Sequence, residues 1–197
     1  MKTLRLGFPL VAVMTAAGCI VQSFFPFCRE ESKVPVPELI GDWQLLTSFG
    51  ADVAGKGIVW SFESEKIVAR DEKTNAATIG VAYFKAGGQL FCDSWAGDAG
   101  DMAAWYWIWH VRPVHTVSKV ELKDDVVKFR PLDLTWLTNV VARGKVKLAA
   151  VDNPKDSWPL FTCSPAEWEK FLAKYAADTN AFPDTHLFVL KKQKPAK

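Results

Sequence analysis

Short stretches in which apolar and polar residues alternate recur along most of the chain, about ten residues apart. Turn-forming sequences such as SEK, DEKTN and AGG separate them. This pattern is typical of an antiparallel meander. It predicts a mainly β fold, an antiparallel up-and-down barrel, with strands in the following segments: 39–49, 57–63, 66–70, 77–86, 89–95, 104–111, 115–123, 126–133 and 185–193.

Two late segments have helical periodicity instead. The first is expected to begin at Asp133 and to end at Gly144, with one apolar face. In the second, Ser164 is suited to the N-cap, Pro165 to the first turn, and Glu167 to closing a capping box with the serine. The predicted barrel therefore carries two helices before its last strand.

The N-terminal stretch has the layout of an export signal. Lys2 and Arg5 precede an apolar run that is broken by Pro9, and small residues follow it. A membrane-spanning helix needs about 20 predominantly apolar residues, and this run is short for that. A bilayer-crossing helix remains the alternative.

Ala16, Ala17 and Gly18 stand directly before Cys19. This sequence resembles the lipobox of bacterial lipoproteins, although those usually have Leu where Ala16 stands. The resemblance implies that residues 1–18 are removed and that Cys19 carries a diacylglyceryl anchor, which holds the protein on a membrane surface. The alternative is a plain signal peptide that is cut near Ala17 or Gly18. Ile20, in place of Asp after the cysteine, favours the outer membrane, with the protein on the periplasmic face of the cell envelope.

The rest of the chain divides by composition into three parts. Residues 19–38 are charged and proline-containing and are expected to form a lipidated tether; 39–191 have the size of one domain; and 192–197 form a basic tail. The chain has 24 Lys and Arg against 22 Asp and Glu, and removal of residues 1–18 leaves 22 against 22. A near-neutral mature chain gives no support to nucleic-acid binding.

Gly41-Asp42-Trp43 matches the Gly-x-Trp sequence on the first strand of lipocalin-like proteins. Together with the strand pattern, it makes residues 39–191 resemble a lipocalin-like barrel, and the whole chain resembles bacterial lipoproteins that carry one such domain. The resemblance implies that Trp43 plugs one end of the barrel. It also implies that a basic side chain near the last strand, Lys191 or Lys192, crosses its ring.

Alternation in the sequence AWYWIWHV places Trp105, Trp107 and Trp109 on one face of a strand. Either these rings line a cavity for an apolar ligand, or they fill the core while the helix at 165–176 covers the opposite face. We expect either a small apolar ligand in the barrel or, alternatively, a structural or interaction module of the envelope without ligand or catalysis. The protein partner of such a module is not identifiable from the sequence.

Four cysteines are present, and lipidation of Cys19 leaves three. An oxidising compartment permits one disulfide, and Cys92 with Cys163 is the preferred pair. No cysteine spacing matches a zinc site.

Catalytic signatures are lacking in the sequence. His110, His115 and His186 stand at no metal-ligand spacing, and the aspartates of DSWAGDAGD do not follow the EF-hand order. No nucleophile elbow, P-loop or dinucleotide fingerprint occurs. We therefore expect no enzyme, no metal and no cofactor.

Overall fold

The computed structural model describes residues 20–70, 76–97, 114–151 and 159–194. In these residues eight antiparallel strands form a closed barrel, in the order β2-β4-β5-β6-β7-β8-β9-β12, and β12 pairs with β2 to complete the ring. Its strands are β2 Gly41–Ser48, β4 Val59–Phe62, β5 Lys66–Arg70, β6 Ala76–Ala86, β7 Gln89–Ala96, β8 His115–Lys123, β9 Val126–Pro131 and β12 Phe188–Lys192. The predicted up-and-down barrel is confirmed.

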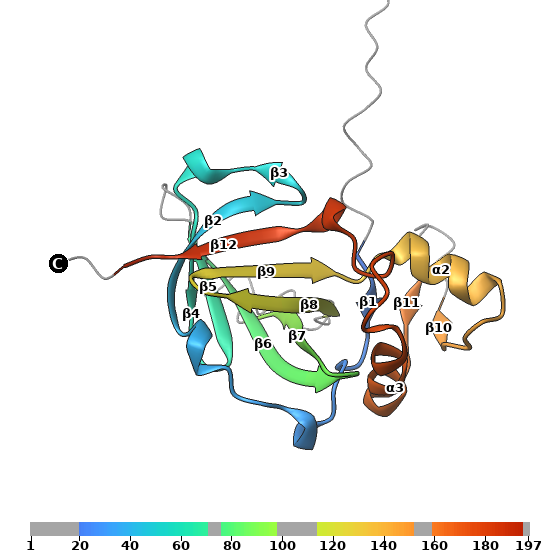
Figure 1. The fold of residues 1–197 in the computed structure, drawn as a ribbon. Coiled ribbons are helices and arrows are strands. Elements are labelled where there is room, and N and C mark those ends of the chain that lie inside the picture. The colour runs from blue at the N-terminus through green and yellow to red at the C-terminus, as the bar shows by residue number, and fades with distance from the viewer. Residues whose placement is uncertain (1–19, 71–75, 98–113, 152–158, 195–197) are drawn as a thin grey trace, which may run out of the picture.

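The other elements lie mostly beside the barrel (Figure 1). A small sheet is formed by β1, β11 and β10, and β1 joins it to the barrel by pairing with β8. Their bounds, with those of β3, the helices and the 3₁₀ turns, are β1 Gln22–Ser23, η1 Glu30–Ser32, η2 Pro37–Leu39, β3 Ala51–Asp52, η3 Ala54–Lys56, α2 Leu134–Ala142, β10 Ala150–Val151, β11 Leu160–Phe161, α3 Pro165–Tyr175 and η4 Asp184–His186.

Both predicted helices form, and their caps are those expected from the sequence. The Asp133 side chain accepts a hydrogen bond from the backbone amide of Trp136 at 2.6 Å. In α3, Ser164 and Glu167 form a reciprocal capping box, in which the Glu167 carboxylate accepts from the Ser164 amide at 2.8 Å. Each cap satisfies backbone amides that have no partner within the helix.

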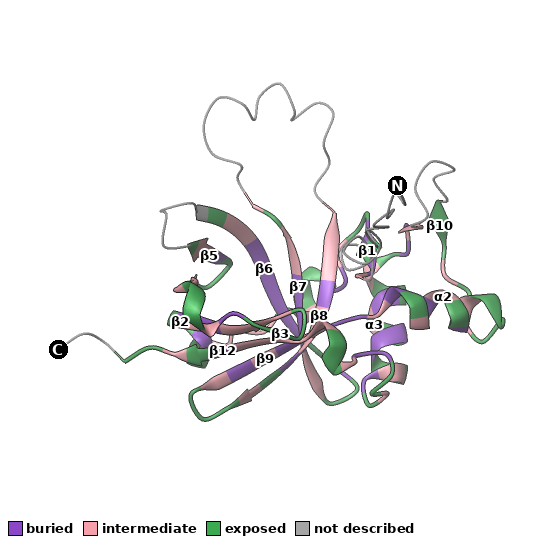
Figure 2. Cartoon of the chain, turned by 90° about the horizontal axis from the view of Figure 1, so that it is seen from above, coloured by how far each residue is buried: buried purple, intermediate pink, exposed green. Residues whose placement is uncertain are grey.

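Two hydrophobic cores lie on opposite sides of β6, β7 and β8, because alternate residues of these strands face opposite ways. The barrel core lies in the interior, and the outer core lies between these strands, the helices and the N-terminal segment. Figure 2 shows the buried residues on the barrel strands and on α3. The barrel core consists of Leu39, Trp43, Leu45, Val53, Phe62, Ile67, Val81, Tyr83, Cys92, Val120, Val127, Phe129 and Leu190. The outer core consists of Val21, Phe27, Cys28, Ala82, Phe84, Ala86, Phe91, Val117, Leu132, Leu134, Leu137, Phe161, Cys163, Trp168, Phe171, Leu172, Ala176, Ala181 and Phe182.

Residues 20–38, which their composition predicts to be a tether, are instead packed against the barrel. Val21 and Phe27 are fully buried in the outer core. Further along, the Val34 amide donates to the Tyr83 carbonyl at 2.8 Å. The charged stretch forms η1, where Lys33 pairs with Glu30. The folded body therefore includes the chain from Ile20 onward, because the few apolar side chains of this segment cover the outer face of the barrel.

Candidate functional site

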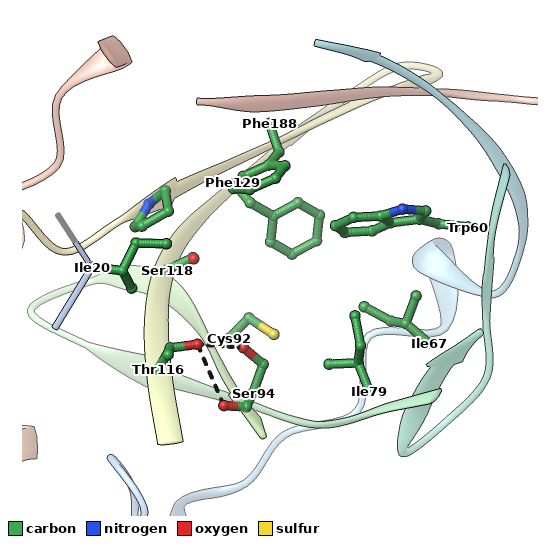
Figure 3. Close-up of a pocket in the computed structure, with 11 residues that line it drawn as sticks. Ile20, Trp60, Ile67, Ile79, Cys92, Ser94, Thr116, Ser118, Phe129 and Phe188 are labelled. Carbon is green, nitrogen blue, oxygen red and sulfur yellow. Dashed lines mark hydrogen bonds between the residues drawn. The ribbon is translucent and has the colours of Figure 1, made fainter. Parts of the chain in front are cut away.

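A cavity of about 180 Å³ lies inside the barrel, bounded by strands from both halves of the sheet (Figure 3). Ile20 lies at one side of it and Trp60 at the opposite side. The lining residues are Ile20, Trp60, Ile67, Ile79, Cys92, Ser94, Thr116, Ser118, Phe129, Pro131 and Phe188. We call this space the barrel cavity.

One wall of the barrel cavity is aromatic and aliphatic. The Trp60 ring lies 5.9 Å from the ring of Phe188 and 6.5 Å from the ring of Phe129, measured between centroids. Ile67 and Ile79 are Cα partners on β5 and β6 and complete this wall. Ring centroids at such distances fall in the range of attractive aromatic contacts, so this wall presents a packed apolar surface.

The opposite wall carries hydroxyl groups. Ser94 on β7 and Thr116 on β8 are Cα partners, and their hydroxyl oxygens lie 2.9 Å apart in a hydrogen bond. Ser118 lines the same wall. A hydroxyl keeps acceptor capacity after donating one hydrogen bond, so this pair is able to accept a further hydrogen bond from a guest molecule.

Cys92 lines the barrel cavity without adding charge, and its Cα partner Tyr83 lies in the barrel core. Burial raises the pKa of the Cys92 thiol well above its usual value, and burial likewise raises the pKa of the Tyr83 hydroxyl. Both groups are therefore neutral at physiological pH. An uncharged lining suits an uncharged guest, because the barrel cavity offers no counter-ion for a charge.

Beyond the barrel cavity, the interior is filled around Trp43. The Trp43 indole is fully buried, and its Nε1 donates to the Leu39 carbonyl at 2.7 Å. The Lys192 ammonium lies 5.2 Å from the Trp43 ring centroid and donates to the Glu38 carbonyl at 2.8 Å. Of the two lysines considered from the sequence, Lys192 is the one that crosses the ring. Gly41 precedes this Trp with a φ of +119°, a conformation suited to glycine.

A second hollow of about 440 Å³ lies over the outer face of β7 and β8. At its base Asp93, which is 1% exposed, accepts hydrogen bonds from the Phe27 amide at 3.2 Å and from His115 Nδ1 at 3.0 Å. Cys28 also borders the hollow, and burial, aided by the charge of Asp93, raises its pKa to about 12. A protonated thiol is a poor nucleophile. The hydrogen bond from the Phe27 amide to the Asp93 carboxylate fixes the N-terminal segment to the barrel.

The predicted Cys92–Cys163 disulfide is not formed. Both residues are free thiols, as is Cys28. Cys92 lies in the barrel core and Cys163 in the outer core, so the wall of the barrel separates them. A disulfide requires that its two cysteines lie close together. The positions of Cys92 and Cys163 in the sequence do not show whether they do.

Two sequence-based site predictions fall outside the described residues. These are the lipidation site Cys19 and the ligand-binding tryptophans Trp105, Trp107 and Trp109. His110 lies outside the described residues as well. Between β7 and β8 the described residues end at Gly97 and begin again at Val114.

The residues that line the barrel cavity were not identified from the sequence. Its hydroxyl groups come from different strands, and only the pairing register brings them together.

In the part of the chain that the structure describes, no three His, Cys, Asp or Glu side chains are grouped so as to hold a metal ion. Within the same residues, no helix has the length and apolar character needed to cross a bilayer.

Comparison with known proteins gives no match of any of the three kinds. No family model matches the chain, no curated protein matches it, and no solved structure matches it.

Proposed function

We propose that this protein is a lipid-anchored component of the bacterial cell envelope whose barrel binds a small, mostly apolar molecule. The barrel cavity carries the proposal, since it combines an aromatic wall with an uncharged hydroxyl wall. Ligand sites in proteins are commonly apolar pockets with a few polar groups that fix orientation. The ligand would place its apolar body against Trp60 and one hydrogen-bonding group near Ser94 and Thr116.

The volume of the cavity limits the size of the ligand. Drug-sized molecules occupy pockets of roughly 300–1,000 Å³, which is more than the 180 Å³ present here. An apolar cavity of about 150 Å³ is known to hold benzene. The ligand class is therefore a single-ring aromatic or a short branched aliphatic compound, with roughly ten non-hydrogen atoms or fewer.

The anchor rests on the residues that precede the described chain. The small residues before Cys19 and the basic start of the sequence support diacylglyceryl attachment. Ile20, in place of Asp after the cysteine, supports location at the outer membrane, on the periplasmic face of the envelope. The intact mass of protein purified from a bacterial membrane fraction tests this part. A mass that includes diacylglycerol on a chain beginning at Cys19 supports the anchor, and an unmodified thiol there excludes it.

Binding is tested with a matched pair of substitutions on β5. Ile67 lines the barrel cavity, whereas its neighbour Val68 lies on the other face of the strand. Ile67→Phe fills the cavity and is expected to abolish the rise in Tm that toluene or phenol gives the wild-type protein. Val68→Phe is the control and is expected to keep that rise. A wild-type Tm unaffected by every such compound at millimolar concentration excludes the proposal and leaves the interaction module as the better explanation.

A further inference from the structure

The small sheet β10-β11-β1 exposes apolar side chains on one face. Its register aligns Val151, Leu160 and Gln22, and places the buried Phe161 and Ser23 on the opposite face. Phe24 and Phe25 follow directly after β1, and both are exposed. Phe24, Phe25 and Val151 are 39%, 42% and 59% exposed.

These side chains stand on a fixed backbone. The Phe24 amide donates to the Phe161 carbonyl at 2.8 Å, and the Ser23 hydroxyl accepts from Trp168 Nε1 at 2.9 Å. The rings of Phe24 and Phe25 contact each other edge to face, with centroids 5.1 Å apart. Water-exposed aromatic rings held in this way are characteristic of a surface that meets an apolar partner.

The chain enters the described structure close to this face. Ile20 forms a bridge with Asp133, and the Val21 amide donates to the Leu132 carbonyl at 3.3 Å. Cys19 is bonded directly to Ile20, so no linker residues separate it from the folded body. Five residues span at most roughly 17 Å, which limits the distance between the Cα atoms of Cys19 and Phe24.

We propose that the face formed by Phe24, Phe25, Leu160 and Val151 rests in the interfacial layer of a lipid bilayer. This inference rests on the lipid anchor proposed above, and it adds an orientation to that anchor. Because Ile20 is also part of the wall of the barrel cavity, the same orientation brings one side of the cavity next to the bilayer. An apolar ligand would then pass directly between the barrel cavity and the membrane, without crossing water.

The test uses the full chain, purified from bacterial membranes and reconstituted in vesicles of phosphatidylethanolamine and phosphatidylglycerol. A thiol-reactive fluorophore is attached to Phe24→Cys, to Val151→Cys and to the control Lys123→Cys. The three described native cysteines are buried, and a lipidated Cys19 has no free thiol. Lys123 is exposed at the end of β8, and His115 at the opposite end of the same strand is the residue that pairs with β1.

Iodide quenching of the fluorophore is expected to be at least threefold weaker at positions 24 and 151 than at 123. With Phe24→Ser and Phe25→Ser added, the label at 151 should become as accessible as that at 123 while the protein stays on the vesicles. Equal quenching at all three positions in the original proteins overturns the proposal. Protection in native membranes but not in vesicles also overturns it, in favour of a protein partner. The intact mass of the purified protein shows whether Cys19 carries diacylglycerol, so failure of the anchor is distinguished from failure of this proposal.

Discussion

The barrel core and the outer core share three strands but are filled in different ways. The outer core is organised around Trp168, whose fully buried ring lies 4.5 Å from Phe27 and donates a hydrogen bond to Ser23. The barrel core leaves the 180 Å³ cavity beside Trp60 and turns hydroxyl groups toward it. Unfilled space and buried hydroxyls reduce stability. The outer core is therefore the better packed of the two, and the binding that we propose would be the reason for the unfilled space in the barrel core.

The largest effect is expected in the outer core. Trp168→Ala removes a ring that contacts Phe27, Phe161 and Phe171, and it is predicted to lower the free energy of unfolding by about 4 kcal/mol. Urea denaturation measures this change. The control is Trp136→Ala, because Trp136 is only partly buried and should give a smaller loss. Equal losses of unfolding free energy in the two variants would contradict the central role that we assign to Trp168 in the outer core.

A smaller effect is expected where the N-terminal segment is fixed to the barrel. Asp93→Ala leaves the Phe27 amide and His115 without their acceptor, and the predicted loss is about 2 kcal/mol. Hydrogen exchange should become faster at the amides of residues 27–29. Asp125→Ala, on the exposed turn between β8 and β9, is the control and should leave that exchange unchanged. Unaltered exchange in Asp93→Ala would show that packing alone holds the segment.

The capping box of α3 gives a weaker, pH-dependent contribution. Hydrogen bonds from the Ser164 side chain and amide lower the pKa of Glu167 below its ordinary value of 4.5. A pKa lowered by folding means that the group stabilises the protein above its unfolded pKa, and that this stabilisation is lost as the pH falls through the folded value. Glu167→Ala should therefore be less stable than wild type at neutral pH and equally stable in acid. A difference that is independent of pH would contradict this account.

The smallest effect on stability is expected in the barrel cavity. Replacing Ser94 by Ala together with Thr116 by Val removes both partners of one hydrogen bond, which should change the free energy of unfolding by less than about 0.5 kcal/mol. The effect on ligand selectivity should be larger than the effect on stability. The double variant should lose affinity for phenol and keep its affinity for toluene. Calorimetric titration compares the two compounds. Parallel losses would show that the hydroxyl wall does not orient the ligand.

Much of the fold follows from local sequence patterns. Strands such as β6 and β7 and the capped helix α3 were predictable because alternation, turn residues and a capping box are all local signals. The arrangement of the N-terminal segment was not predictable, since Val21, Phe27 and Cys28 follow no regular period. Their burial depends on an apolar outer face of the barrel that only the tertiary structure provides.

The candidate site was largely hidden from the sequence for a related reason. Trp43 and Lys192 were identified through a resemblance, and they come together as it implied. Ser94 and Thr116 are ordinary strand residues in the sequence, and only the register between β7 and β8 makes them a pair beside the cavity. The Cys92–Cys163 pairing was wrong because sequence spacing does not show on which side of the barrel wall each thiol lies.

Native mass spectrometry of the full chain purified from its membrane tests ligand binding in the barrel cavity most directly. We expect wild type and Val68→Phe to retain the same small molecule, and Ile67→Phe to lack it, with the acylated chain mass otherwise unchanged. Identical spectra for the three proteins, apart from the substituted side chains, would contradict binding in the barrel cavity.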